Sequence, residues 1–159
     1  MTFFARVFSL VEDIPSRSAI CDELLDAGHE FATSPGKDED GFKDYDWTSM
    51  DFQYDGNLPL IHLERNTEEM DGELFRDEIK EFIEAVDALP YEKNTKKVKS
   101  IFSEIKQIYA FKLEEEMDEK GWELVEDTLD FIKDSTDGYV QIDGEGIYDK
   151  EGKMMLEFA

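Results

Sequence analysis

The spacing of hydrophobic residues predicts strands at both ends of the chain. Residues 3–10 are rich in aromatic and β-branched residues on both faces of an extended chain, which is typical of a strand covered on both sides. Near the C-terminus, strand-like runs at 139–142, 147–148 and 154–158 are separated by turns that contain Asp and Gly. We therefore expect an interior N-terminal strand and a C-terminal hairpin or meander.

A central hairpin is the clearest local signal. Strand-like runs at 45–54 and 58–65 flank Asp55-Gly56, a dipeptide that suits a two-residue turn with positive φ. The alternation of side chains then gives the hairpin one apolar face and one mixed polar and aromatic face. The cross-strand pairs that this turn predicts are Tyr54–Asn57, Phe52–Pro59, Met50–Ile61, Thr48–Leu63 and, on the mixed face, Ser49–His62.

Helical spacing of apolar residues is found between these strands. Ser16 is a suitable N-cap for a helix over 17–27 that ends at Gly28. In the other helical segments, apolar residues recur three and four positions apart. These segments are 72–89, 95–109 with an extension toward Met117, and 120–134.

This order of elements predicts an α+β fold, because strands come first, helices are grouped, and strands come last. We expect a single domain, 1–159, in which a mostly antiparallel sheet packs against three to four helices. The sheet would contain the N-terminal strand, the central hairpin and the C-terminal hairpin. The charged segment 34–44, with one Pro and two Gly, is expected to be an exposed loop and the most mobile region.

The charge of the chain narrows the classes of partner. Its 159 residues include 41 acidic and 17 basic side chains, which gives a net charge of −24. Such a protein repels nucleic acid phosphates and anionic lipid surfaces, so direct binding to nucleic acid or to a membrane is not expected. Hydrophobic residues still make up 40% of the chain, which separates it from disordered acidic tails.

Two features favour a cytoplasmic location. Cys21 is the single cysteine, so no internal disulfide can form, and a lone thiol suits a reducing compartment. The apolar N-terminus is short, is interrupted by Arg6 and lacks the basic start of a signal peptide. No run reaches the ~20 apolar residues that a membrane span needs.

The mixed face of the hairpin carries the residue types of a hydrolytic triad. Ser49, His62 and Asp51 could serve as nucleophile, base and orienting carboxylate, which leaves a hydrolase as an alternative function. An open hairpin offers neither an oxyanion hole nor a sheltered pocket, which argues against this alternative. His29 and His62 have no partner at metal-ligand spacing, and no phosphate-binding glycine loop precedes a helix. We therefore expect no metal and no cofactor.

The acidic helices lead to the preferred interpretation. Carboxylates follow the predicted helices 72–89 and 120–134, and the simplest explanation for them is solubility. The sharper interpretation is a non-enzymatic interaction module, immunity-like or adaptor, that binds a basic protein. Exposed aromatic residues inside a charged rim would anchor that partner. The residues expected at this interface are Tyr45, Trp47, Asp44, Asp46, Asp51 and Glu64.

A DNA-mimicking inhibitor, whose carboxylates imitate phosphates, is a further alternative. It would need acidic pairs at regular separations on one face of the protein. In composition, though not in any motif, the chain resembles small acidic bacterial proteins, including immunity proteins that neutralise basic toxins. If the chain associates with itself, an exposed sheet edge favours a two-fold homodimer.

Overall fold

The N-terminal strand lies inside the sheet, as its apolar pattern predicts. In the structure, a computed structural model that describes residues 2–158, β1 (Thr2–Ser9) pairs antiparallel with β5 (Gln107–Glu114) and with β6 (Gly138–Ile142). Val7 on one face and Phe8 on the opposite face are both fully buried. Burial on both faces explains why the strand is apolar along its length.

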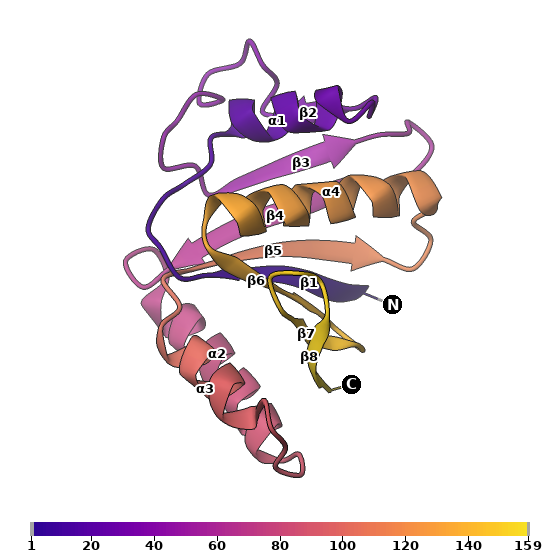
Figure 1. Ribbon diagram of the computed structural model, residues 1–159. Helices are drawn as coiled ribbons and strands as arrows, with labels where there is room; N and C mark the ends of the chain where they lie inside the picture. Colours follow the sequence, from indigo (N-terminus) through magenta and orange to yellow (C-terminus); the bar gives the residue numbers. More distant parts are fainter. Residues whose placement is uncertain (1, 159) are drawn as a thin grey trace.

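The remaining strands extend the same antiparallel sheet on both sides (Figure 1). They are β2 (Ala32–Ser34), β3 (Ser49–Gln53), β4 (Ile61–Thr67), β7 (Gly146–Tyr148) and β8 (Met154–Glu157). The strand order is β2-β3-β4-β5-β1-β6-β7-β8. An antiparallel sheet packed against helices confirms the predicted α+β class.

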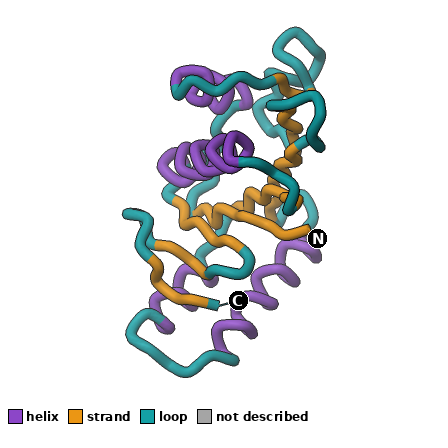
Figure 2. Tube along the Cα trace, turned by 90° about the vertical axis from the view of Figure 1, so that its right-hand side faces the viewer, coloured by secondary structure: helices purple, strands orange, loops and turns teal. Residues whose placement is uncertain are grey.

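One face of the sheet is covered by α1 (Arg17–Asp26) and α4 (Glu119–Ser135), which pack against each other. Figure 2 shows both helices on the same side of the strands. The Ser16 hydroxyl caps α1 by accepting from a backbone N–H at 2.9 Å, and the Asp118 carboxylate caps α4 at 3.1 Å. The first core between these helices and the sheet includes Ile20, Leu24, Leu63, Phe111, Leu124, Leu129 and Ile132.

The opposite face is covered by α2 (Gly72–Asp87) and α3 (Thr95–Ser103), which pack against each other and lie below the strands in Figure 1. They bury a second core, in which Phe75 and Phe102 join Phe8 of β1. The rings of Phe8 and Phe102 meet edge to face with centroids 5.2 Å apart. None of the helices within residues 2–158 combines the length and the apolar composition of a membrane span.

Strands β3 and β4 turn one face toward the first core and leave the other open. Met50 and Phe52 of β3 are buried, whereas Asp51 between them is half-buried and Gln53 is exposed. The same alternation continues in β4, where Glu64 is exposed. This part of the sheet therefore presents a polar surface, which we call the open face.

The central hairpin exists, but its register differs from the prediction by two residues. Asp51 lies opposite His62, and Ser49 lies opposite Glu64 instead of His62. The turn is wider than two residues, because β4 begins only at Ile61, and the intervening Pro59 has no N–H to donate to a strand ladder. A shift of two residues preserves the alternation, so the paired residues of β3 and β4 stay on their predicted faces.

The predicted helix over 95–109 is wrong in its second half. Helix α3 ends at Ser103, and 107–114 forms β5, which pairs with both β1 and β4 in the middle of the sheet. Ile108 faces the second core and Tyr109 the first, so the strand is apolar on both faces. A strand of this kind loses the polar–apolar alternation that would distinguish it from a helix.

Candidate functional site

Trp47 is a core residue and not the exposed anchor that the sequence predicts. Its side chain is 2% exposed, whereas that of Tyr45 is 75% exposed. The indole N–H donates to the Pro15 carbonyl at 2.8 Å, and the ring centroid lies 5.9 Å from that of Tyr109. The prediction failed because 45–48 form a turn and irregular chain, which places Trp47 in the first core.

Two buried arginines hold the loop that carries Trp47. Arg17 donates to the Gly41 carbonyl, and Arg65 donates to the Trp47 carbonyl at 2.8 Å. Both guanidinium groups also lie over the indole ring, with Cζ 5.7 and 6.0 Å from its centroid. Most of the predicted loop 34–44 is exposed, but its C-terminal half is tied to the body of the protein.

The residues predicted to contact a partner do not share one surface. Asp51 and Glu64 lie on the open face, whereas Trp47 packs into the core on the other side of the sheet. Asp44 and Asp46 are exposed in the loop before β3. The sheet therefore separates Trp47 from Asp51 and Glu64, and Trp47 does not share an exposed surface with them.

His62 lies between two carboxylates on the open face. Its Nδ1 is 2.6 Å from Oδ1 of Asp51, directly across the hairpin, and its Nε2 is 2.9 Å from Oε1 of Glu64. Partial burial lowers the pKa of His62, but the hydrogen bonds and the charges of the two carboxylates outweigh it and raise the pKa overall. The surroundings therefore favour the imidazolium form.

This arrangement does not assemble the hydrolytic triad. A serine nucleophile needs a basic nitrogen within hydrogen-bond reach of its hydroxyl. Both ring nitrogens of His62 already contact carboxylates, and Ser49 lies opposite Glu64. Within residues 2–158, the structure thus brings together Asp51 and His62 but leaves Ser49 out of the pair.

The outer sides of α1 and α4 form a strongly negative surface. Among the described residues of these two helices, Lys120 is the one exposed cation, because Lys133 is half-buried and Arg17 is buried. His29, just after α1, contacts Asp127 of α4 at 2.6 Å and links the two helices. We call their exposed carboxylates the acidic layer: Asp22, Glu23, Asp26, Glu119, Glu123, Glu126, Asp130 and Asp134.

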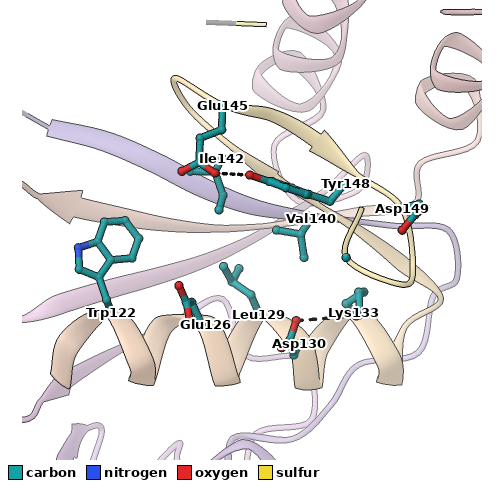
Figure 3. A pocket seen from close by; sticks show the side chains of 11 residues that line it. Trp122, Glu126, Leu129, Asp130, Lys133, Val140, Ile142, Glu145, Tyr148 and Asp149 are labelled. Atoms are coloured by element: carbon teal, nitrogen blue, oxygen red, sulfur yellow. Dashed lines mark hydrogen bonds and ion pairs between the residues drawn. The ribbon is translucent and has the colours of Figure 1, made fainter. Parts of the chain in front are cut away.

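A cavity of about 420 Å³ lies at the edge of this layer, between α4 and the last strands (Figure 3). We call it the α4 cavity. Its apolar floor is formed by Leu129, Val140 and Ile142, and aromatic rings of Trp122 and Tyr148 stand at its sides. Its charged lining residues are Glu126, Asp130, Lys133, Glu145 and Asp149.

The carboxylates of the α4 cavity are crowded. Partial burial and the neighbouring charges of Asp130, Asp127 and Glu123 raise the pKa of Glu126. The Tyr148 hydroxyl donates to Glu145, and this hydrogen bond raises the pKa of Tyr148 to about 12. The phenol therefore stays neutral at physiological pH.

The single cation in the cavity wall is already engaged. Lys133 Nζ donates to the Lys150 carbonyl at 3.1 Å and lies 3.7 Å from Oδ1 of Asp130 and 3.6 Å from Oδ1 of Asp134. Its side chain is 12% exposed, so the ammonium is held at the wall. Glu126, Glu145 and Asp149 have no contact with it, which leaves the cavity negative.

Sequence reasoning missed the α4 cavity because its residues come from separate elements. Only one signal was available, the recurrence of Trp122, Glu126 and Asp130 one helical turn apart on α4. That recurrence places them along one side of the helix but says nothing of the strands that face it. The tertiary contact between α4 and β6 completes the cavity.

Comparisons with family models, with curated proteins and with solved structures gave no match. The function therefore has to be argued from the geometry of this chain. Within residues 2–158, no three His, Cys, Asp or Glu side chains are grouped in a way that would hold a metal ion.

Proposed function

We propose that this protein is a non-enzymatic binding module that recognises a basic protein through the acidic layer of α1 and α4. One observation carries the proposal: two adjacent helices that cover one face of the sheet expose eight carboxylates and one lysine. The helices form a rigid platform because their inner sides are anchored in the first core.

A surface of this kind favours association with a cationic partner in two ways. Its field speeds the encounter of oppositely charged proteins, and it disfavours acidic competitors. Crowded carboxylates also repel one another in the free protein, and a basic partner relieves that repulsion. The proposed interface is therefore on the helices and not on the hairpin residues Tyr45 to Asp51.

Affinity capture with matched charge variants tests the proposal. One variant neutralises part of the acidic layer (Asp22→Asn, Glu23→Gln, Asp26→Asn and Glu123→Gln). The control variant makes the same change in net charge on and around α2 (Glu69→Gln, Glu73→Gln, Asp77→Asn and Glu92→Gln). All eight positions are exposed.

We expect the wild-type protein to capture proteins that are more basic than the extract average, and to release them as salt increases. The acidic-layer variant should lose most of this capture and the control variant should keep it. Capture of proteins no more basic than average, or an equal loss in both variants, would contradict the proposal.

The carboxylates of α4 also favour DNA mimicry as a second candidate function. Glu119, Glu123, Glu126, Asp130 and Asp134 follow one another every three or four residues, so that about 4.5–6 Å of helix separates successive carboxylates. Such a regular row would suit the DNA site of a nuclease or repressor. In that case duplex DNA should displace the captured proteins at constant ionic strength, and a short anionic polymer without base pairs should not.

A further inference from the structure

We propose that the α4 cavity binds one arginine side chain of the basic partner. This inference rests on the proposed function, because it names the point at which the partner's cation is recognised. The acidic layer by itself does not define where on its surface a partner side chain binds. The α4 cavity gives one such position and favours one type of side chain.

The size and lining of the cavity suit a long side chain with a charged end. Its volume of about 420 Å³ lies within the range of about 300–1,000 Å³ that is usual for ligand sites. The floor of Leu129, Val140 and Ile142 can contact an aliphatic stem. Trp122 and Tyr148 line the cavity, and aromatic rings attract cations, the indole ring most strongly.

The charges of the cavity select the sign of the ligand. Four carboxylates line it, against one lysine that is bound to the Lys150 carbonyl and lies close to Asp130. Partial burial and the charges of neighbouring carboxylates raise the pKa of Glu126, and its carboxylate forms no ion pair with Lys133. These carboxylates would repel an anion such as phosphate, whereas a cationic ligand would relieve their mutual repulsion.

Arginine fits this lining better than lysine does. Its guanidinium is planar, stacks on aromatic rings and can donate to two carboxylates at once. The cavity offers flat aromatic surfaces at its sides and carboxylates from α4 and from the loop between β6 and β7. A lysine ammonium is more strongly hydrated and would use these surfaces less fully.

The indole N–H signals of the two tryptophans give a direct test in the full-length protein. Trp122 lines the cavity, whereas Trp47 is buried in the first core and serves as the internal control. The probes are N-acetylarginine amide, its lysine counterpart and the uncharged isostere N-acetylcitrulline amide. We expect the arginine probe to shift the Trp122 signal and not the Trp47 signal, the lysine probe to bind more weakly, and the citrulline probe to have no effect.

Two matched variants locate the site. Glu126→Gln removes a carboxylate of the cavity, and Glu73→Gln removes one that is exposed on α2, outside both the cavity and the acidic layer. Loss of a charge-assisted hydrogen bond should weaken binding of the arginine probe by about tenfold in Glu126→Gln, with little change in Glu73→Gln. An unchanged Trp47 signal would show that both variants are folded.

The outcomes separate this inference from the proposed function. If the acidic layer captures basic proteins but the arginine probe leaves Trp122 unshifted, the assignment of the cavity is overturned and the proposed function stands. If the probe binds but Glu126→Gln leaves capture unchanged, the partner's arginine is not the occupant and the inference is overturned. Reduced capture by Glu126→Gln, with Glu73→Gln near wild type, supports it.

Discussion

The indole of Trp47 joins the loop before β3 to the rest of the protein. Its ring lies in the first core between two guanidinium groups, and its N–H is bonded to Pro15. A buried aromatic side chain of this size makes contacts that a smaller residue cannot replace. Its main contribution is therefore to stability.

We expect Trp47→Ala to lower the free energy of unfolding by about 3–5 kcal/mol, because it leaves a large cavity and removes a buried hydrogen bond. Tyr45→Ala, at an exposed position two residues away, should change it by about 0.5 kcal/mol or less. Urea unfolding of both variants measures the difference. Similar losses in the two variants would mean that Trp47 is not buried in solution.

His62 should titrate above the ordinary histidine value of 6.5. Its raised pKa in the folded state means that protonation stabilises the fold. This contribution is fully present below the unfolded value of about 6.5 and is lost as the pH rises through the folded pKa. The ring signals of His62 in an NMR titration report that pKa.

Asp51→Asn is the matched variant for this titration, because it removes the carboxylate 2.6 Å from Nδ1 and keeps the shape of the side chain. The pKa of His62 should then fall, since the partial burial that lowers it is less fully opposed. Lys112, the cation directly opposite His62 on β5, is present in both proteins, so it does not account for a difference in the pKa of His62 between them. A pKa that does not respond would show that the Asp51 contact is absent in solution.

At the scale of elements, the starts of the helices are easier to predict than the pairing of the strands. Ser16 marks the start of α1, and the apolar spacing within 72–89 and 120–134 matches α2 and α4 closely. Local chemistry decides these features. In contrast, β5 could be identified as a strand only from its pairing with β1 and β4 in the structure. Its burial on both faces gives it an apolar pattern that a helix also produces.

The candidate site shows the same division. The sequence was sufficient to place Asp51 and His62 on one face of a hairpin, since alternation depends on single residues. It could not fix their register, because Pro59 delays the start of β4. The α4 cavity was beyond sequence reasoning, because it depends on how α4 lies across β6.

Amide hydrogen exchange tests the position of β5 within the sheet. Its amides should exchange among the slowest in the protein, together with those of β1, because both strands are paired on two sides and lie between the two cores. The edge strands β2 and β8 should exchange much faster. If the amides of 107–114 instead exchange as fast as those of the edge strands, the segment is not a central strand.

At the scale of the whole molecule, net charge opposes folding. A charge of −24 on one domain produces repulsion that added salt screens. We expect the midpoint of thermal unfolding to rise with sodium chloride at low concentrations, and the acidic-layer variant to show a smaller rise. Sucrose, which stabilises without screening charge, should raise the midpoint of both proteins equally. An equal response of the two proteins to salt would show that the acidic layer is not a main source of the repulsion.

The position of β1 has a consequence for synthesis on the ribosome. This strand is translated before the other strands of the sheet, yet both of its partners, β5 and β6, belong to the last third of the sequence. Its phenylalanines must therefore stay unpaired while about a hundred further residues are translated, a topology that folds slowly and exposes apolar surface on the way. Nascent chains that stop before residue 107 should depend on chaperones.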